Sequence, residues 1–390
     1  MRYLKTLNRL WQAISIPVTA VVIALLIGAL ILYISGINPL VAYGALFEGA
    51  LGEPKGVQRT IEKATPLIFS GLAVAFAFKA GLFNIGAQGQ LVFGALTSAV
   101  VGFMIPEETL PALIHIPLAL LAGAIAGGLY GALPGYLKTA TGAHEVITTI
   151  MLNFIALNIT DFLADGPLKD PSPTNIVART PKIVESARIP LIGDWLPEMR
   201  DLAVMESGSE WAQYWVEVIY LFPIGFFLSL VMVVLTAWLL WRTTLGYEIR
   251  TVGQNANAAR YAGIKVARTV VITMAISGAL AGLGGAVETQ GVVERFEPGF
   301  NVGLGFDGIT IALLGKTNPY GVVPAALLVG AMKAGSSKMQ FDSGTPPEIV
   351  DVILAIILFF IAAEVIIRWI LRQKGEGDGL TLTSGWGGSN

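Results

Sequence analysis

The sequence predicts an all-α, polytopic membrane protein with about ten transmembrane helices. Of its 390 residues, 54% are hydrophobic and only 13% are charged, and the mean hydropathy is +0.69. Apolar runs recur along the chain, and about 20 residues of helix are enough to cross the ~30 Å hydrocarbon core of a bilayer. Glycine-bearing breaks interrupt two of these runs. A composition this apolar makes the bilayer the solvent for most of the chain.

Charge and cysteine content exclude several other classes of protein. The net charge of −2 is too small to indicate a nucleic-acid partner. Without cysteine the chain has no disulfide and no thiolate metal site, and its two histidines are too few for a histidine-based metal centre. We therefore expect neither a metal nor a cofactor.

Five spans are predicted in the first half of the chain. Basic residues precede the first apolar run, residues 17–35, which is too long for a signal peptide. We expect an uncleaved span there, preceded by a cytoplasmic N-terminal segment, residues 1–16. An amphipathic piece is expected outside the membrane at residues 39–51. The other four spans are predicted at residues 61–78, 90–105, 112–137 and 146–163.

Residues 66–96 contain the break around which the first half is organised. Backbone groups at a break lack helical partners, and each unpaired group costs several kcal/mol in hydrocarbon. Such backbone persists at membrane depth only where it is buried in protein or lines a wet cavity. Asn84, Gln88 and Gln90 favour a polar path at this point. The alternative is that residues 81–90 form a cytoplasmic turn between two ordinary spans.

The second half contains another broken span. Full spans are predicted at residues 218–241, 269–290, 322–339 and 348–370. Residues 305–315 are apolar, but 11 residues of helix reach only about half of the bilayer. The transmembrane domain thus covers residues 17–370, and the glycine-rich residues 371–390 are expected to form a disordered cytoplasmic tail.

The positions of Lys and Arg predict the orientation of the chain. Residues 242–268 carry five basic residues and one acid, whereas residues 164–217 carry nine acids and five bases. Because short cytoplasmic loops are enriched in Lys and Arg, the first segment is predicted to be a cytoplasmic loop and the second an external insert. An even number of spans then places both termini in the cytoplasm.

The two halves of the sequence share a similar order of spans. Residues 66–96 pair a glycine-bearing span with a broken one, and residues 269–315 do so again, five spans later. An odd offset makes the halves inverted in the membrane, an arrangement that many transporters use. Chance enrichment of glycine in membrane helices is the alternative explanation.

Neutral polar residues are the candidates for a substrate path. Thr149, Asn153 and Asn158 lie on the fifth span, and they join the three amide residues of the first break. Such residues can also hold helices together. Most ionisable residues fall near the predicted span ends. No carboxylate lies clearly at the midplane, which counts against a proton-driven carrier.

Two nucleotide-binding patterns occur without their structural context. Residues 303–308 match GxGxxG, but no strand precedes them. Residues 315–317 resemble the end of a P-loop, but Thr310 stands where a Walker A sequence needs glycine. We therefore expect no ATPase site in this chain and no enzymatic activity.

The cytoplasmic loop contains a short helix signal. Asn255 can cap a helix that runs to Tyr261 and ends at Gly263. This segment, residues 246–264, resembles the coupling segment of permease subunits of ABC importers of the branched-chain amino acid, ribose and nucleoside class. Residues 64–90, 142–163 and 179–190 resemble the nucleoside and simple-sugar branch most closely. The resemblance covers about residues 17–370, and one departure is Gln88, where that branch often has Glu.

The resemblance implies a type II importer permease fold in the cell membrane. Its partners would be a separate ATP-binding subunit, a second permease as a homodimer or heterodimer, and a substrate-binding lipoprotein or periplasmic protein. Nucleosides are the expected cargo, with simple sugars or branched-chain amino acids as alternatives in the same class. A self-sufficient secondary carrier and a channel or scaffold subunit are alternatives from other classes. The family's ATPase docking role falls on Gly253, Asn255, Ala258, Ala259, Arg260 and Gly263.

Overall fold

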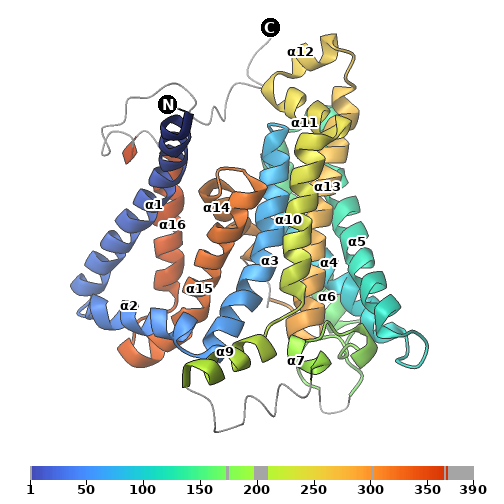
Figure 1. The fold of residues 1–390 in the computed structure, drawn as a ribbon. Helices are drawn as coiled ribbons and strands as arrows, with labels where there is room; N and C mark the ends of the chain where they lie inside the picture. The colour runs from blue at the N-terminus through green and yellow to red at the C-terminus, as the bar shows by residue number, and fades with distance from the viewer. Residues whose placement is uncertain (1, 173–174, 197–209, 300–302, 364–365, 368–390) are drawn as a thin grey trace.

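The chain folds into a bundle of helices, many of which run along a common direction (Figure 1). The computed structural model describes residues 2–172, 175–196, 210–299, 303–363 and 366–367. Within these ranges it has no β-strand, only an isolated bridge between Leu191 and Pro223. The predicted all-α membrane fold is confirmed. The predicted tail, residues 371–390, lies outside the described residues.

Seven helices in the described ranges are long and apolar enough to cross a membrane. The first, Ser15–Ile34, is the apolar part of α1 (Arg2–Ile34), which continues through Pro17 and so joins the predicted N-terminal segment to the first span. The others are α3 (Pro54–Lys79), α4 (Ala87–Met104), α5 (Ala112–Thr141), α6 (Glu145–Asp165), α10 (Gly225–Arg242), and α13 (Val266–Glu288) with its π-helical extension η3 (Thr289–Val293).

Helices also occupy the other three predicted spans. The predicted half-span is the 11-residue helix α14 (Leu304–Leu314). It is followed by α15 (Pro319–Ser343), which is long enough to cross but carries several charges, and by α16 (Glu348–Ala362).

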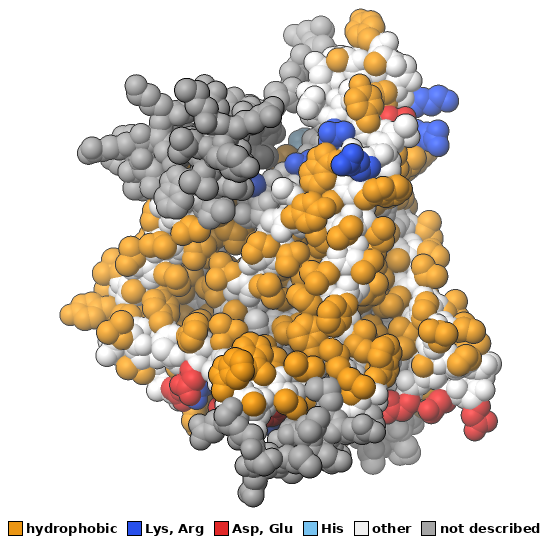
Figure 2. All heavy atoms as spheres, in the orientation of Figure 1, with side chains coloured by type: hydrophobic (Ala, Val, Ile, Leu, Met, Phe, Trp, Pro, Cys, Tyr) orange, Lys and Arg blue, Asp and Glu red, His pale blue; other side chains and the backbone are white. Residues whose placement is uncertain are grey.

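The two ends of the bundle differ in charge. One end carries α11 (Thr244–Gln254) and α12 (Ala256–Tyr261), and we call it the α12 end. The opposite end carries α2 (Pro39–Phe47) with η1 (Glu48–Gly52), η2 (Glu185–Ala187), α7 (Ile192–Trp195) and α9 (Glu210–Tyr220), and we call it the α9 end. On the face seen in Figure 2, Lys and Arg gather around the α12 end, whereas Asp and Glu lie at the α9 end.

Glycines allow α5 and α13 to pack closely. A Cβ on Gly282 would lie 2.5 Å from the carbonyl oxygen of Gly123, and one on Gly127 would lie 2.5 Å from that of Gly278. These distances are too short for any side chain, so only glycine permits this separation of the two backbones. The glycine-rich stretches that the sequence shows on each helix are therefore the two sides of one interface.

The long helices that begin the two halves, α3 and α13, run in opposite directions. α3 runs from the α9 end to the α12 end and packs on α14 and α15, while α13 runs in the opposite direction and packs on α4 and α5 (Figure 1). In each half, a long helix is followed by a break, a half-helix or shorter helix, and a long return helix. The opposite directions of α3 and α13 are what the predicted inverted repeat requires.

Candidate functional site

The first break begins at the α12 end and reaches the middle of the bundle. After α3 the chain turns at Gly81, which has a φ of +69°, and α4 starts only at Ala87. Asn84 Nδ2 donates to Ser277 Oγ at 2.7 Å, and Ser277 lies halfway along α13. The sequence left two alternatives for this segment, a polar path or a cytoplasmic turn. In the structure the segment has a feature of each: it turns at the α12 end, and its polar side chains reach the middle of the bundle.

Amide side chains bind one another and the backbone at this break. Asn84 and Gln90 exchange two hydrogen bonds, of 2.8 and 3.0 Å. Asn153, from the middle of α6, donates to the carbonyl oxygen of Ile85 and accepts from the N–H of Gly89, both at 2.8 Å. The side chain of Asn153 thus satisfies two backbone groups at the break, the carbonyl of Ile85 and the N–H of Gly89.

The second break meets the first. Gln88 Oε1 accepts hydrogen bonds from the N–H groups of Gly303, at 3.2 Å, and Gly305, at 2.8 Å. A Cβ on Gly305 would overlap the backbone of Gln88. Ser70 Oγ in α3 donates to the carbonyl oxygen of Leu304 at 3.0 Å. The N-termini of α4 and α14 therefore adjoin inside the bundle, and we call this contact the half-helix junction.

Five of the six predicted path residues are buried at or beside the half-helix junction. Four of the five are the amide residues Asn84, Gln88, Gln90 and Asn153. The fifth, Thr149, packs on the break: a Cβ built on Gly86 would lie 3.1 Å from the Cβ of Thr149. Asn158 differs: its side chain is exposed on α6 and donates to the carbonyl oxygen of Phe154 at 2.7 Å. The structure therefore does not bring Asn158 together with the other five.

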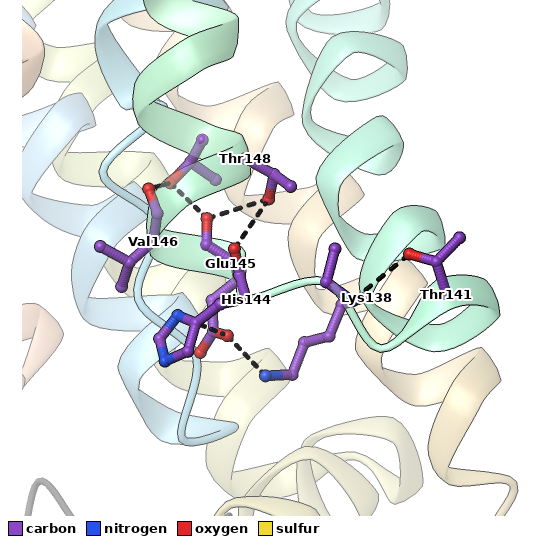
Figure 3. A network of polar contacts seen from close by, with 8 residues as sticks. Lys138, Thr141, His144, Glu145, Val146 and Thr148 are labelled. Carbon is purple, nitrogen blue, oxygen red and sulfur yellow. Dashed lines mark hydrogen bonds and ion pairs between the residues drawn. The ribbon is translucent and has the colours of Figure 1, made fainter.

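The start of α6, which carries Thr149 and Asn153, is held by polar contacts at the turn after α5 (Figure 3). Lys138 Nζ at the end of α5 lies 2.5 Å from Glu145 Oε2 at the beginning of α6. Thr149 Oγ1 donates to the carbonyl oxygen of Glu145 at 2.7 Å. These contacts set the position of Asn153 two turns further along the helix.

A cluster of charged residues lies close to the half-helix junction. Lys333 Nζ, in the interior of α15, lies 2.9 Å from Asp307 Oδ2 and 3.3 Å from Asp351 Oδ1. Asp307 is on the first turn of α14, whose start touches Gln88. The sequence did not indicate this cluster, because its three charges come from three different helices.

The predicted docking segment folds as expected. Asn255 caps α12 by accepting from the N–H groups of Asn257, at 3.0 Å, and Ala258, at 2.9 Å. The helix ends before Gly263, which has a φ of +84°. Asn255, Ala258, Arg260 and Gly263 are exposed, while Ala259 is buried.

Gly253 connects the docking segment to the first break. It is the second-last residue of α11, and a Cβ there would overlap the carbonyl oxygen of Lys79 at the end of α3. Gly81 lies against the backbone of Gly253 from the other side, with its ideal Cβ 3.3 Å from the Gly253 oxygen. Displacement of α11 and α12 would therefore press directly on the segment that leads to the half-helix junction.

Replacing Gln88 tests the hydrogen bonds across the half-helix junction. In Gln88→Leu, the N–H groups of Gly303 and Gly305 lose their acceptor, at about 1–3 kcal/mol for a buried unpaired group. We expect a lower melting temperature and reduced uptake. Gln88→Glu keeps an acceptor oxygen and should retain most of both. Equal stability of the Leu and Glu variants, measured on purified protein, would contradict this role of Gln88.

Comparison with known proteins agrees with this architecture. Residues 56–362 match the family described as "Branched-chain amino acid transport system / permease component". The guanosine ABC transporter permease protein NupP of Bacillus subtilis is 41% identical over 364 residues, which are 92% of this chain and 97% of NupP. The nucleoside ABC transporter permease protein NupB of Lactococcus lactis is 35% identical over 368 residues, 94% of this chain and 95% of NupB.

A third relative is named for a different substrate. The glucose ABC transporter permease protein TsgB13 of Haloferax volcanii is 33% identical over 360 residues, 92% of this chain and 90% of TsgB13. No solved structure matches the chain. The family match and the full-length similarity lead to one conclusion: this chain is a multi-pass membrane protein that belongs to the branched-chain amino acid transport system permease family.

Proposed function

We propose that this chain is the membrane-spanning subunit of an ATP-driven importer of nucleosides. The observation that carries the proposal is the 41% identity to a guanosine permease over nearly the whole of both chains. A second relative named for nucleosides, at 35% identity, supports the same cargo. The chain would form the substrate path and take its energy from a separate ATPase.

The polar groups of the half-helix junction suit such a cargo. A nucleoside is uncharged and rich in hydrogen-bond donors and acceptors, so amide and hydroxyl groups can replace its water without a buried charge. We propose that the path passes the half-helix junction. There Asn84, Gln88, Gln90, Thr149 and Asn153 form or position its wall, while Asn158 sits apart on the exposed face of α6.

Uptake of labelled substrates tests the cargo. Cells that carry the complete transporter are expected to take up guanosine and adenosine, and unlabelled nucleosides should compete with each other but not with leucine. Asn153→Leu, which removes both hydrogen bonds to the first break, should reduce uptake without altering which substrates compete. Uptake of glucose or ribose without competition by nucleosides would instead favour a simple-sugar permease, in line with the third relative.

We further propose that α12 docks on the ATP-binding subunit. Its exposed residues Asn255, Ala258, Arg260 and Gly263 would form the contact, and buried Ala259 would keep the helix seated on its own chain. ATP-driven movement of α12 would reach the first break through Gly253 and Lys79. The substrate would arrive from a binding protein at the α9 end, and a second permease would complete the path.

This arrangement requires the α12 end and both termini to face the cytoplasm. The chain has no cysteine, so single cysteines report their own position without background labelling. Ser172→Cys in the predicted external insert should react with a membrane-impermeant maleimide in intact cells, and Ala267→Cys, at the start of α13 and outside the proposed docking residues, should react only after permeabilisation. Both replaced residues are exposed, so burial would not explain a missing signal. The reverse pattern would overturn the orientation.

A further inference from the structure

Three charged residues from α14, α15 and α16 form a cluster. Lys333 on α15 pairs with Asp307 on α14 and with Asp351 on α16, as described above. Asp351 is on the first turn of α16, near the α9 end. We call these three residues the ionic face. It ends beside the half-helix junction, because Asp307 lies on the first turn of α14.

Part of the ionic face is open to its surroundings. Lys333 is more than two turns from either end of α15, and its side chain remains 24% exposed. The side chain of Asp351, its partner on α16, is 65% exposed. Phe306, the neighbour of Asp307 in sequence, is 42% exposed. Charged and aromatic side chains are therefore both accessible on this face.

Other faces of the bundle have a different character. The exposed residues of α5 include Leu121, Ile125 and Leu129, and those of α6 include Met151 and Phe154. These apolar side chains suit contact with lipid. Ionised side chains in a membrane face the bundle interior or water, because hydrocarbon does not solvate them. The exposed carboxylate of Asp351 and the ammonium of Lys333 therefore require water beside them.

We propose that the ionic face lines the water-filled substrate path between the α9 end and the half-helix junction. Its carboxylates would accept hydrogen bonds from the ribose hydroxyls of a nucleoside, and Phe306 would stack on the nucleobase. The recognition of a nucleoside rests on the proposed function, whereas contact of the face with water does not. In the assembled transporter, the second permease would close this path from the opposite side.

Thiol accessibility distinguishes a water-filled path from a lipid face or a dry protein contact. Val352→Cys, next to Asp351 and 42% exposed, leaves all three charges in place. Phe306→Cys probes the face beside Asp307. A negatively charged, membrane-impermeant methanethiosulfonate reagent is added to the complete transporter in membranes. We expect both cysteines to react at least tenfold faster than the control Ile125→Cys, which is 60% exposed on α5.

The outcomes separate the two parts of the proposal. If Val352→Cys and Phe306→Cys react no faster than the α5 control, the ionic face does not line a water-filled path. If they react fast but guanosine with its binding protein does not slow them, in a transporter that imports guanosine, the recognition of nucleoside at this face is wrong. Failure to import any nucleoside would overturn the proposed function, while the labelling rates would still decide whether the face meets water.

A second variant tests recognition directly. Asp351→Asn removes the charge but keeps the shape of the side chain. We expect it to raise the KM for guanosine several-fold and to affect 2′,3′-dideoxyguanosine much less, because that analogue lacks the hydroxyls that a carboxylate would bind. An equal effect on both substrates would indicate a structural role for Asp351 and would contradict its contact with ribose.

Discussion

Gly263→Trp in the segment after α12 is expected to abolish ATP-driven uptake while the permease still folds and inserts. Gly263 is exposed and has no atom within 4 Å of the position that a Cβ would occupy, so an indole fits on the isolated chain. Its φ of +84° adds backbone strain of about 1–2 kcal/mol for a side chain. The added bulk would stand on the surface that we propose for ATPase docking.

The measurement combines uptake, copurification of the ATP-binding subunit and ATP hydrolysis stimulated by loaded binding protein. Gly142→Trp is a matched control: this glycine follows α5 before the turn to α6, is exposed, has a φ of +72° and has no neighbour within 4 Å. Arg260→Glu, which reverses an exposed charge in the last turn of α12, should give the same loss as Gly263→Trp. Normal coupling in both docking variants would place the ATPase contact elsewhere.

Gly282→Val is expected to give the largest loss of stability. The side chain would lie on the carbonyl oxygen of Gly123, 2.5 Å from its Cβ, and on the backbone of Gly127 in α5. Overpacking in a well-packed core costs about 1–3 kcal/mol, and here a backbone, rather than a flexible side chain, would have to move. We expect less protein in the membrane and a clearly lower melting temperature in detergent.

Gly44→Val provides the control for this variant. Gly44 lies within α2, and a Cβ there would meet no atom within 4 Å. Both changes place valine in a helix, so the difference between them isolates the contact between α5 and α13. If the two variants melted at the same temperature, the close approach of these helices would contribute little to stability.

Local features of this protein were predictable because they depend on neighbouring residues. Asn255 and Gly263 bound a helix through side-chain and backbone bonds to residues at most four or five positions away. The short run at residues 305–315 predicted a half-helix, because length alone decides whether a helix can cross. The composition likewise predicted a membrane fold, because the apolar content of the chain can be read without knowing which helices contact each other.

The depth of a residue in the bundle and the helix that it contacts were not predictable in this way. Gln88 and Gly305 are 217 residues apart in sequence, yet one hydrogen bond between them joins α4 to α14. The glycines of α5 and α13 indicated close packing without indicating that they pack on each other. An apolar run shows that a segment is buried, but all its neighbours are equally apolar, so the run cannot specify which helix it contacts.

The sequence by itself determined that this chain is an all-helical membrane protein with two breaks and a short capped helix, α12. Each of these follows from hydrophobic length, glycine content and short-range hydrogen bonds. Only the tertiary structure decided that the breaks meet, that Asn158 stands apart from the other amides, and that Lys333 joins Asp307 and Asp351. The physical reason is that a buried polar group must find a partner, and in a bundle this partner comes from whichever helix the fold brings near.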